Sequence, residues 1–230
     1  MSTSLNKYLA QTGICSRRKA DTWIAAGRVK INGTVARKGN RVAPGDAVTL
    51  DDRPLDARPD LVYLALHKPA GVTCTTDRRD PTNIIDFVGY PERIFPIGRL
   101  DKPSTGLILL TNDGDIVNQI LRVEGAHEKE YVVTVDRPVT GDFLRKMAGG
   151  VPILGTVTKR CKVQKQGKQG FRIILTQGLN RQIRRMCEHL GYRVRTLQRV
   201  RIMNLHLDRL PPGAYRPLTP AELRELRQQL

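Results

Sequence analysis

The stretch IFPIGRLDKPSTGLILL, residues 94–110, combines turn residues with a buried strand and determines the fold expected for the larger part of the chain. Its apolar end, LILL, is typical of a buried strand, while Gly98 and the run from Pro103 to Gly106 favour turns on either side of Asp101. The spacing of a phosphate loop, GxxxxGK[ST], is absent. Catalytic groups are frequent at such loop-strand junctions. From the residues alone, Asp101 is equally well interpreted as an exposed turn carboxylate or as a catalytic group.

The segments around this stretch predict an α+β fold. Further β-prone runs are YLALHK (63–68), EKEYVVTV (128–135), FRIILT (171–176) and YRVRTLQRVRIMNLHL (192–207). Amphipathic helices are expected over GDIVNQILR (114–122), TGDFLRKMAG (140–149) and NRQIRRMCEHLG (180–191). Because strands and helices alternate irregularly at hairpin-scale spacing, we expect a mostly antiparallel mixed sheet. A final helix is expected after Thr219, which forms a capping box with Glu222.

Residues 1–58 predict a separate, smaller domain. Helices are expected over LNKYLAQTG (5–13) and RRKADTWIAAG (17–27), the second capped by Ser16. The pair Asn32-Gly33 between short β-prone runs predicts a hairpin. The stretch DDRPLDARPD, residues 51–60, interrupts the apolar pattern, and we place the domain boundary near residue 58, with the second domain over residues 59–230.

The charge of the chain indicates a polyanionic partner. Lys and Arg number 39 against 22 Asp and Glu, a formal net charge of +17. Between residues 159 and 201 a single acidic residue, Glu188, faces thirteen basic ones: Lys159, Arg160, Lys162, Lys165, Lys168, Arg172, Arg181, Arg184, Arg185, Arg193, Arg195, Arg199 and Arg201. A solvated surface normally mixes both signs, so this imbalance favours contact with nucleic acid.

The first domain carries its own candidates for phosphate contact. Arg17, Arg18 and Lys19 crowd the first turn of the second expected helix, where cations oppose the helix dipole. A bound anion would offset that cost. Arg28 and Lys30 extend the same basic surface.

The stretch QGLNRQIRRMCEHLG, residues 177–191, supplies cations for the Asp101 region. We expect Asn180 to cap this helix, an apolar stripe to run along one side, and Arg181, Arg184 and Arg185 to share the opposite side. An arginine beside a carboxylate favours its ionised form. Three solvated arginines that contact only phosphate are the alternative. Tyr131 also has two interpretations: it is either a core aromatic or a stacking platform for a base.

Several functional classes find no support in the sequence. The four cysteines are widely spaced and the four histidines dispersed, so neither a zinc site, another metal site nor a disulfide framework is expected. We expect no cofactor. The N-terminus lacks the apolar stretch of a signal peptide and no apolar run is long enough for a membrane span. A cytoplasmic protein is therefore expected.

Three stretches, GRLDKPSTGL, KEYVVTV and GLNRQIRRM, closely resemble the signatures of bacterial pseudouridine synthases in the branch that contains the small-subunit synthase A. Residues 5–33 resemble the S-four-type RNA-binding domain that precedes the catalytic domain in that branch. Residues 127–140 and 151–163 are similar to members that act on large-subunit rRNA. The resemblance covers nearly the whole chain.

The resemblance implies that a target uridine is flipped out of the RNA, detached at N1–C1′, turned and rejoined through C5, without metal or cofactor. It implies that Asp101 is the nucleophile or assists a glycal route, that Arg184 forms a salt bridge with it, and that Tyr131 stacks on the uracil. Arg99 lies where some relatives insert an arginine into the vacated stack, and Arg181 where several have histidine.

The expected substrate is 23S rRNA, with 16S rRNA and tRNA as alternatives, and the expected oligomeric state is a monomer. Two other classes of function stay open on the residues alone. One is a non-catalytic RNA-binding factor for ribosome assembly, and the other is a metal-dependent RNA nuclease.

Overall fold

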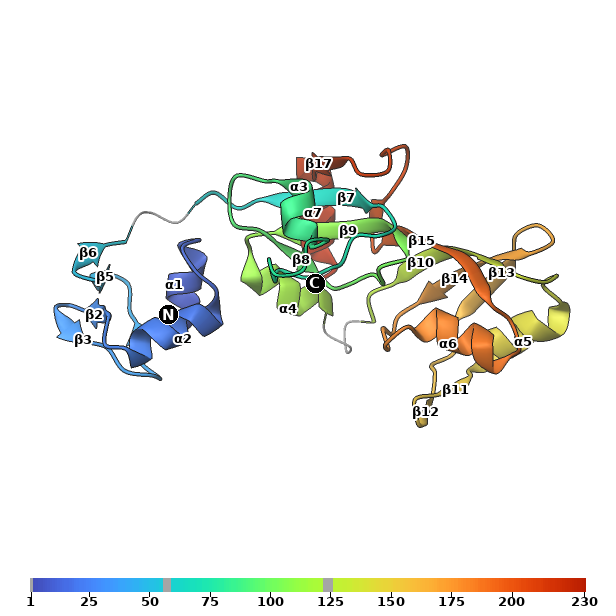
Figure 1. The fold of residues 1–230 in the computed structure, drawn as a ribbon, viewed down its shortest axis with the longest axis horizontal. Helices are drawn as coiled ribbons and strands as arrows, with labels where there is room; N and C mark the ends of the chain where they lie inside the picture. The colour runs from blue at the N-terminus through green and yellow to red at the C-terminus, as the bar shows by residue number, and fades with distance from the viewer. Residues whose placement is uncertain (1, 56–58, 122–125) are drawn as a thin grey trace. The chain divides into compact units, whose positions relative to one another are not determined.

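The computed structural model describes residues 2–55, 59–121 and 126–230 (Figure 1). The chain forms two compact units, one from residues 1–62, 91–94 and 112–114, and the other from the remaining segments. The boundary expected near residue 58 lies outside the described residues.

The first unit combines two helices with short strands. Its elements are β1 (Thr3–Ser4), α1 (Leu5–Gln11), α2 (Arg17–Ala25), β2 (Val29–Ile31), β3 (Thr34–Val35), β4 (Arg41–Val42), β5 (Val48–Leu50) and β6 (Arg53–Pro54). The Ser16 hydroxyl accepts a hydrogen bond from the Lys19 amide, so the expected N-cap is confirmed. Asn32 and Gly33 both have positive φ between β2 and β3, which confirms the hairpin.

The second unit is built on a nine-stranded sheet. Its elements are β7 (Tyr63–Lys68), α3 (Ile84–Val88), β8 (Phe95–Ile97), β9 (Thr105–Thr111), α4 (Gly114–Leu121), β10 (Lys129–Val135), α5 (Gly141–Gly149), β11 (Pro152–Ile153), β12 (Thr156–Val157), β13 (Lys162–Lys165), β14 (Gly170–Leu175), α6 (Gln182–His189), β15 (Val194–Ile202), β16 (Leu205–His206), β17 (Tyr215–Pro217) and α7 (Pro220–Gln228).

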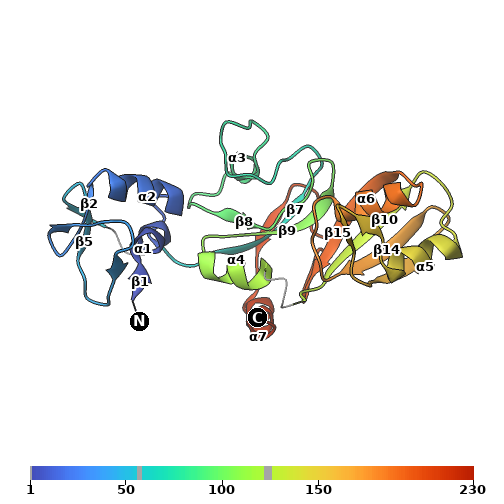
Figure 2. The same ribbon diagram turned by 90° about the horizontal axis from the view of Figure 1, so that it is seen from below.

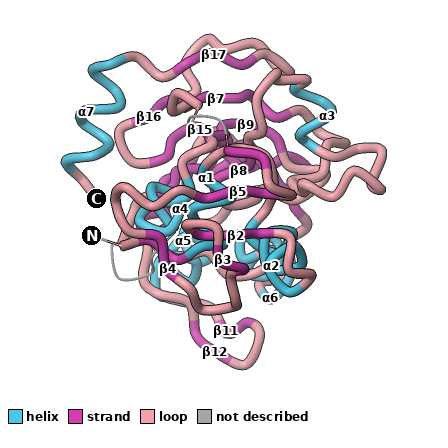
Figure 3. Tube along the Cα trace, turned by 90° about the vertical axis from the view of Figure 1, so that its left-hand side faces the viewer, coloured by secondary structure: helices cyan, strands magenta, loops and turns pink. Residues whose placement is uncertain are grey.

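The main strand order is β13-β14-β10-β15-β9-β7-β17, and Figure 3 shows β9, β7 and β17 side by side. β8 pairs with β9, and β16 pairs with β15. All of these pairings are antiparallel except β15 with β9, which is parallel. The expected mostly antiparallel mixed sheet is therefore confirmed.

The parallel pair brings two backbones very close at Gly106. Gly106 lies opposite Arg199 with a φ of +109°, and a Cβ added to it would lie 2.2 Å from the Arg199 carbonyl oxygen. Only glycine fits this position. β9, the strand that follows the Asp101 loop, therefore pairs with β15 at its first two residues.

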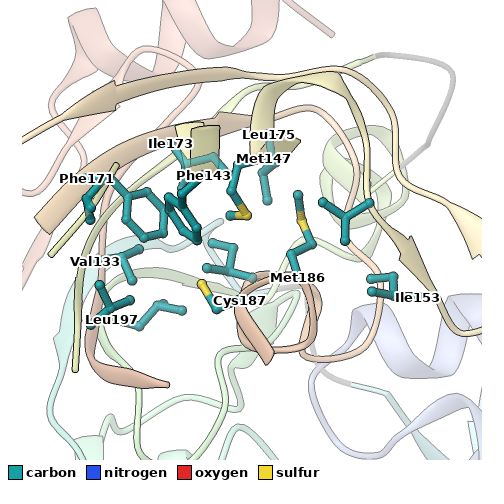
Figure 4. Close-up of a cluster of buried hydrophobic side chains, with 14 residues drawn as sticks. Val133, Phe143, Met147, Ile153, Phe171, Ile173, Leu175, Met186, Cys187 and Leu197 are labelled. Carbon is teal, nitrogen blue, oxygen red and sulfur yellow. The ribbon is translucent and has the colours of Figure 1, made fainter. Parts of the chain in front are cut away.

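Helices α5 and α6 cover one part of the sheet, beside β10 and β14 in Figure 2. Their apolar sides form a buried cluster with the sheet that includes Val133, Phe143, Phe171, Met186 and Leu197 (Figure 4). The cluster fixes α6, which carries Arg184, against the sheet that contains β10, the strand of Tyr131.

A second cluster packs α4 and α7 against the sheet around β7 and β9. Its buried residues include Leu107, Leu109, Ile116, Ile120 and Leu226. The strands before and after the Asp101 loop, β8 and β9, contribute Ile97, Leu107 and Leu109 to this second core.

The last helix, α7, begins with the capping box expected from the sequence. The Thr219 hydroxyl accepts a hydrogen bond from the Glu222 amide, and the Glu222 carboxylate accepts one from the Thr219 amide.

Candidate active site

Asp101 lies in the loop between β8 and β9. The loop turns tightly, since the Ser104 amide donates a hydrogen bond of 2.9 Å to the Asp101 carbonyl. The Asp101 side chain is 28 % exposed, so its carboxylate is held by the protein and still reaches the surface of a cavity.

Buried Lys68, at the end of β7, is hydrogen-bonded to this loop. Its Nζ donates hydrogen bonds to the carbonyls of Pro69 and Val72 at 2.8 Å and of Lys102 at 3.3 Å. Burial lowers the pKa of Lys68, and the charges of Cys74 and Asp101 oppose that shift. A fully buried ammonium thus ties the residue after Asp101 to the turn that follows β7.

Arg184 and Arg181 approach Asp101 from α6 and from the residue before it. Arg184 Nε lies 3.4 Å and Arg181 Nη1 3.9 Å from Asp101 Oδ2. Arg184 Nη2 also donates a 3.0 Å hydrogen bond to the Ser104 hydroxyl. Asp101, Ser104 and Arg184 therefore form one connected group.

Two sequence-based expectations for this helix are wrong. Asn180 is not the N-cap, because the helix starts at Gln182 after Arg181 in a left-handed conformation, and the Asn180 oxygens accept hydrogen bonds from Arg185. Arg184 does not share a solvated side with Arg181 and Arg185. It is buried, because its ion pair with Asp101 and its hydrogen bond to Ser104 hold it against the loop between β8 and β9.

A cavity of about 690 Å³ opens over this group. Tyr131 lines it together with Asp101, Arg184, Arg181 and Arg99. Tyr131 is partly buried and packs on the core that Val133 and Val135 help to form. A large aromatic ring and a carboxylate thus line the same cavity.

Three further cations line the cavity: Lys102 directly after Asp101, Lys129 on β10 and Arg199 on β15. Arg199 is cross-strand from Tyr131, and its Nε donates a 2.7 Å hydrogen bond to the Leu107 carbonyl. Burial lowers the pKa of Lys129, and the charge of Arg199 adds to the shift. Our interpretation of the sequence missed Lys68, Lys129, Ser104 and Arg199 as site residues.

The period-two alternation of KEYVVTV could have revealed Lys129, since it lies two residues before Tyr131 on the same face. Nothing local indicates Arg199, whose position depends on the pairing of β15 with β9.

Arg185 and Arg99 are the remaining candidates in the second unit. Arg185 is bonded to Asn180 and does not line the cavity. Arg99 is exposed at the cavity wall. In the first unit, Arg17, Arg18 and Lys19 are exposed on α2.

Arg28 and Lys30 carry charges that acidic neighbours already oppose. Arg28 pairs with Asp51, and Lys30 Nζ lies 2.5 Å from Asp52 Oδ1. Lys19 and Arg28 also lie over the Trp23 ring, 5.8 and 5.4 Å from its centroid. Among these five cations, those of α2 are the ones with no acidic partner in the described part of the chain.

Within residues 2–55, 59–121 and 126–230, no group of three or more His, Cys, Asp or Glu side chains has the arrangement of a metal site. None of the helices in these ranges has the length and apolar content that a membrane span needs.

A carboxylate held by a buried arginine, an aromatic ring in the same cavity and a strongly basic chain favour an enzyme that acts on a nucleic acid, and comparison with known proteins gives its class. Residues 62–189 match the family model described as RNA pseudouridylate synthase, and residues 3–48 match the S4 domain. The chain belongs to the RNA pseudouridylate synthase family.

Its relatives include the dual-specificity RNA pseudouridine synthase RluF of Escherichia coli (strain K12), 56 % identical over 227 residues, which are 98 % of this chain and 78 % of the relative. Ribosomal large subunit pseudouridine synthase B of Bacillus subtilis (strain 168) is 35 % identical over 97 % of this chain and 95 % of its own. A solved structure described as a pseudouridylate synthase aligns with a TM-score of 0.72 at 32 % identity, over 98 % of this chain and 100 % of that one.

These findings confirm the expected enzyme, an RNA pseudouridine synthase with an N-terminal S4 domain. Synthase F is among the members that residues 127–140 and 151–163 were expected to resemble, and the 56 % identity with RluF over 227 residues confirms that resemblance for the chain as a whole. An RNA substrate is thereby established, and the non-catalytic factor and the nuclease are disfavoured.

Proposed function

We propose that Asp101 is the group that makes pseudouridine formation possible in this enzyme. Its carboxylate either attacks C1′ of the target uridine or takes part in a glycal route, and Arg184 keeps it ionised and oriented. The observation that carries this proposal is the Asp101–Arg184 contact of 3.4 Å at the wall of the cavity.

Tyr131 receives the flipped uracil in this proposal. A stacked base cannot be turned, so the uridine must leave the RNA helix at a cost of a few kcal/mol. Stacking on an aromatic ring returns about 1–3 kcal/mol. The partly buried Tyr131 ring, supported from behind by the core of β10, is suited to that role.

The RNA is held by basic residues of both units. We assign this role to Arg17, Arg18, Lys19, Arg28 and Lys30 in the first unit. In the second unit it falls to Arg99, Arg181 and Arg185, with Arg99 filling the place that the flipped base leaves. These cations would provide the phosphate contacts on which affinity for RNA depends.

The substrate we propose is 23S rRNA, or an assembly intermediate that contains it, in the cytoplasm. The name of the Bacillus subtilis relative, a large-subunit synthase, supports this choice, and the dual-specificity name of the Escherichia coli relative makes tRNA the second candidate. We propose that the enzyme acts as a monomer and uses its own side chains without a metal. Mapping pseudouridines in rRNA and tRNA of a deletion strain identifies the target.

Tritium release from RNA labelled at uridine C5 tests Asp101. Asp101→Asn should abolish release, while Asp142→Asn, which removes an exposed carboxylate on α5, should leave it unchanged. Release by Asp101→Asn at the wild-type rate would refute the role of Asp101.

A further inference from the structure

Arg199 is a buried cation whose charge is only partly used by the fold. It is 3 % exposed, and one of its terminal nitrogens, Nη2, is buried without a hydrogen-bond acceptor. An unpaired polar atom in the protein interior costs about 1–3 kcal/mol, more when it is charged. Nη2 itself has no exposed surface, but Arg199 lines the cavity that holds Asp101 and Tyr131, so its positive charge acts on a ligand bound there.

Lys129 places a second cation in the same wall. Its Nζ donates a 3.2 Å hydrogen bond to the His127 carbonyl, which leaves further N–H donors. Burial and the nearby Arg199 charge lower the pKa of Lys129, so both disfavour its charged form. An anion beside both groups would offset this effect.

The acidic residues of these strands are engaged elsewhere. Glu130 pairs with Arg172 and Arg201, and Glu128 pairs with Arg201. Asp101 is held by Arg181 and Arg184. Within the described ranges, no ion pair of Lys129 or Arg199 offsets the charge of this wall.

We propose that Lys129 and Arg199 form an anion-stabilising wall that takes up the negative charge of the detached uracil. Breaking N1–C1′ leaves the bonding electron pair on the uracil, spread over N1, O2 and O4. Oriented cations in a site sheltered from water stabilise such developing charge. Arg181 and Arg184 face the carboxylate, whereas this pair faces the leaving group.

The same wall serves both routes at C1′. In direct attack, an Asp101 oxygen joins C1′ as the uracil leaves. In the glycal route, the C2′ proton passes to Asp101 as the uracil leaves. In both routes the uracil departs as an anion and turns before C5 bonds to C1′. In direct attack, this bond displaces the Asp101 oxygen from C1′. In the glycal route, Asp101 returns the proton to C2′ as the bond forms. The C5 hydrogen then leaves as a proton to solvent, and N1 takes one from solvent.

The test compares two leaving groups, and it rests on the proposed role of Asp101. A transcript of the RNA region that the wild-type enzyme modifies is prepared with uridine or 5-fluorouridine at the target. Fluorine withdraws electrons and makes the detached anion more stable, so its departure needs less help from the protein. Consumption of the target nucleoside is followed in single turnovers by nuclease digestion and mass spectrometry.

Arg199→Gln should slow consumption of uridine about 100-fold, the size of effect that loss of one anion-stabilising donor has. It should slow consumption of 5-fluorouridine about tenfold, because the free energy that Arg199 supplies at the transition state is smaller for the better leaving group. Arg199→Lys should restore part of the rate. Arg145→Gln, which removes an exposed cation on α5, is the matched control and should change neither rate.

Lys129→Met is the second variant and decides the matter if Arg199→Gln does not fold. Equal losses on both RNAs, or weaker RNA binding with an unchanged rate, would overturn the proposal, since the first indicates a structural role and the second a phosphate contact. Asp101→Asn should consume neither nucleoside, and activity there would refute the role of Asp101 separately.

Discussion

Gly106 shows how a single residue without a side chain sets the geometry of the site. Its positive φ and its contact with the Arg199 backbone hold the exit of the Asp101 loop against β15. Neither neighbour can move away easily, because both strands lie within the sheet.

Gly106→Ala should therefore lower the free energy of unfolding by at least about 2–3 kcal/mol, the cost of overpacking plus an unfavourable φ. Gly149→Ala is the matched control, because this helical glycine has open space around its Cα, and the change should be neutral or stabilising by up to about 1 kcal/mol. Chemical denaturation measures both. A Gly106→Ala protein of wild-type stability would contradict the close approach.

Lys68 supports the loop through its three carbonyl contacts. Methionine fits the space of Lys68 but leaves these carbonyls without a donor. Lys68→Met should therefore lower the free energy of unfolding by at least about 2 kcal/mol. A shift of the loop by about 1 Å should slow turnover about 100-fold. Tritium release and thermal unfolding measure these effects, with Lys146→Met on the surface of α5 as the control. Normal turnover in Lys68→Met would show that the loop holds itself.

At the level of elements, local signals predicted structure well and tertiary contacts were not visible. Ser16, the Asn32-Gly33 turn and the Thr219 capping box each act within a few residues, and all three were predicted. The start of α6 was wrong, because Arg181 adopts a left-handed conformation that no local preference for Asn180 reveals. The burial of Arg184 depends on a loop 80 residues away.

Helix α7 depends on one carboxylate, Glu222, for a pH-sensitive part of its stability. Hydrogen bonds from Arg216 at 2.7 and 2.8 Å, joined by one from the Thr219 amide, lower the pKa of Glu222 from 4.5 to about 2. Because the folded pKa lies below the unfolded one, this stabilisation is complete above pH 4.5 and is lost as the pH falls through about 2.

Glu222→Gln should destabilise the protein by about 2 kcal/mol at pH 7. The difference from wild type should shrink as the pH falls from 4.5 toward 2. Urea denaturation at a series of pH values measures it, and Glu225→Gln on the same helix should have little effect. A difference that does not change with pH would indicate that packing, not charge, is lost.

For the whole molecule, composition alone predicted the nucleic-acid partner, and the signature stretches predicted the enzyme. The placement of Lys68 and Arg199 at the site depends on strand pairing that no local pattern reveals. The roles of Asp101, Tyr131 and Arg184 remain predictions that the geometry supports.

Arg17→Ala together with Arg18→Ala should weaken RNA binding and flatten its salt dependence, because two phosphate contacts are lost. The slope of log affinity against log salt should fall by about 1.4 to 1.8. Arg28→Ala should change the slope less, since Asp51 already opposes its charge. Filter binding at several salt concentrations measures the slope for the wild type, the double variant and Arg28→Ala. An unchanged slope in the double variant would show that α2 does not contact the RNA.

The parallel pairing of β9 with β15 also fixes the order in which the enzyme can mature during its own synthesis. Arg199 bonds to a residue 92 positions earlier in the chain, and Arg184 to one 80 positions earlier. Asp101 therefore leaves the ribosome long before its counter-ion and the neighbouring strand exist. Contacts of such long sequence separation form slowly. The nascent chain can fold its S4 domain early, but it acquires a complete cavity only after nearly all of the chain has been translated.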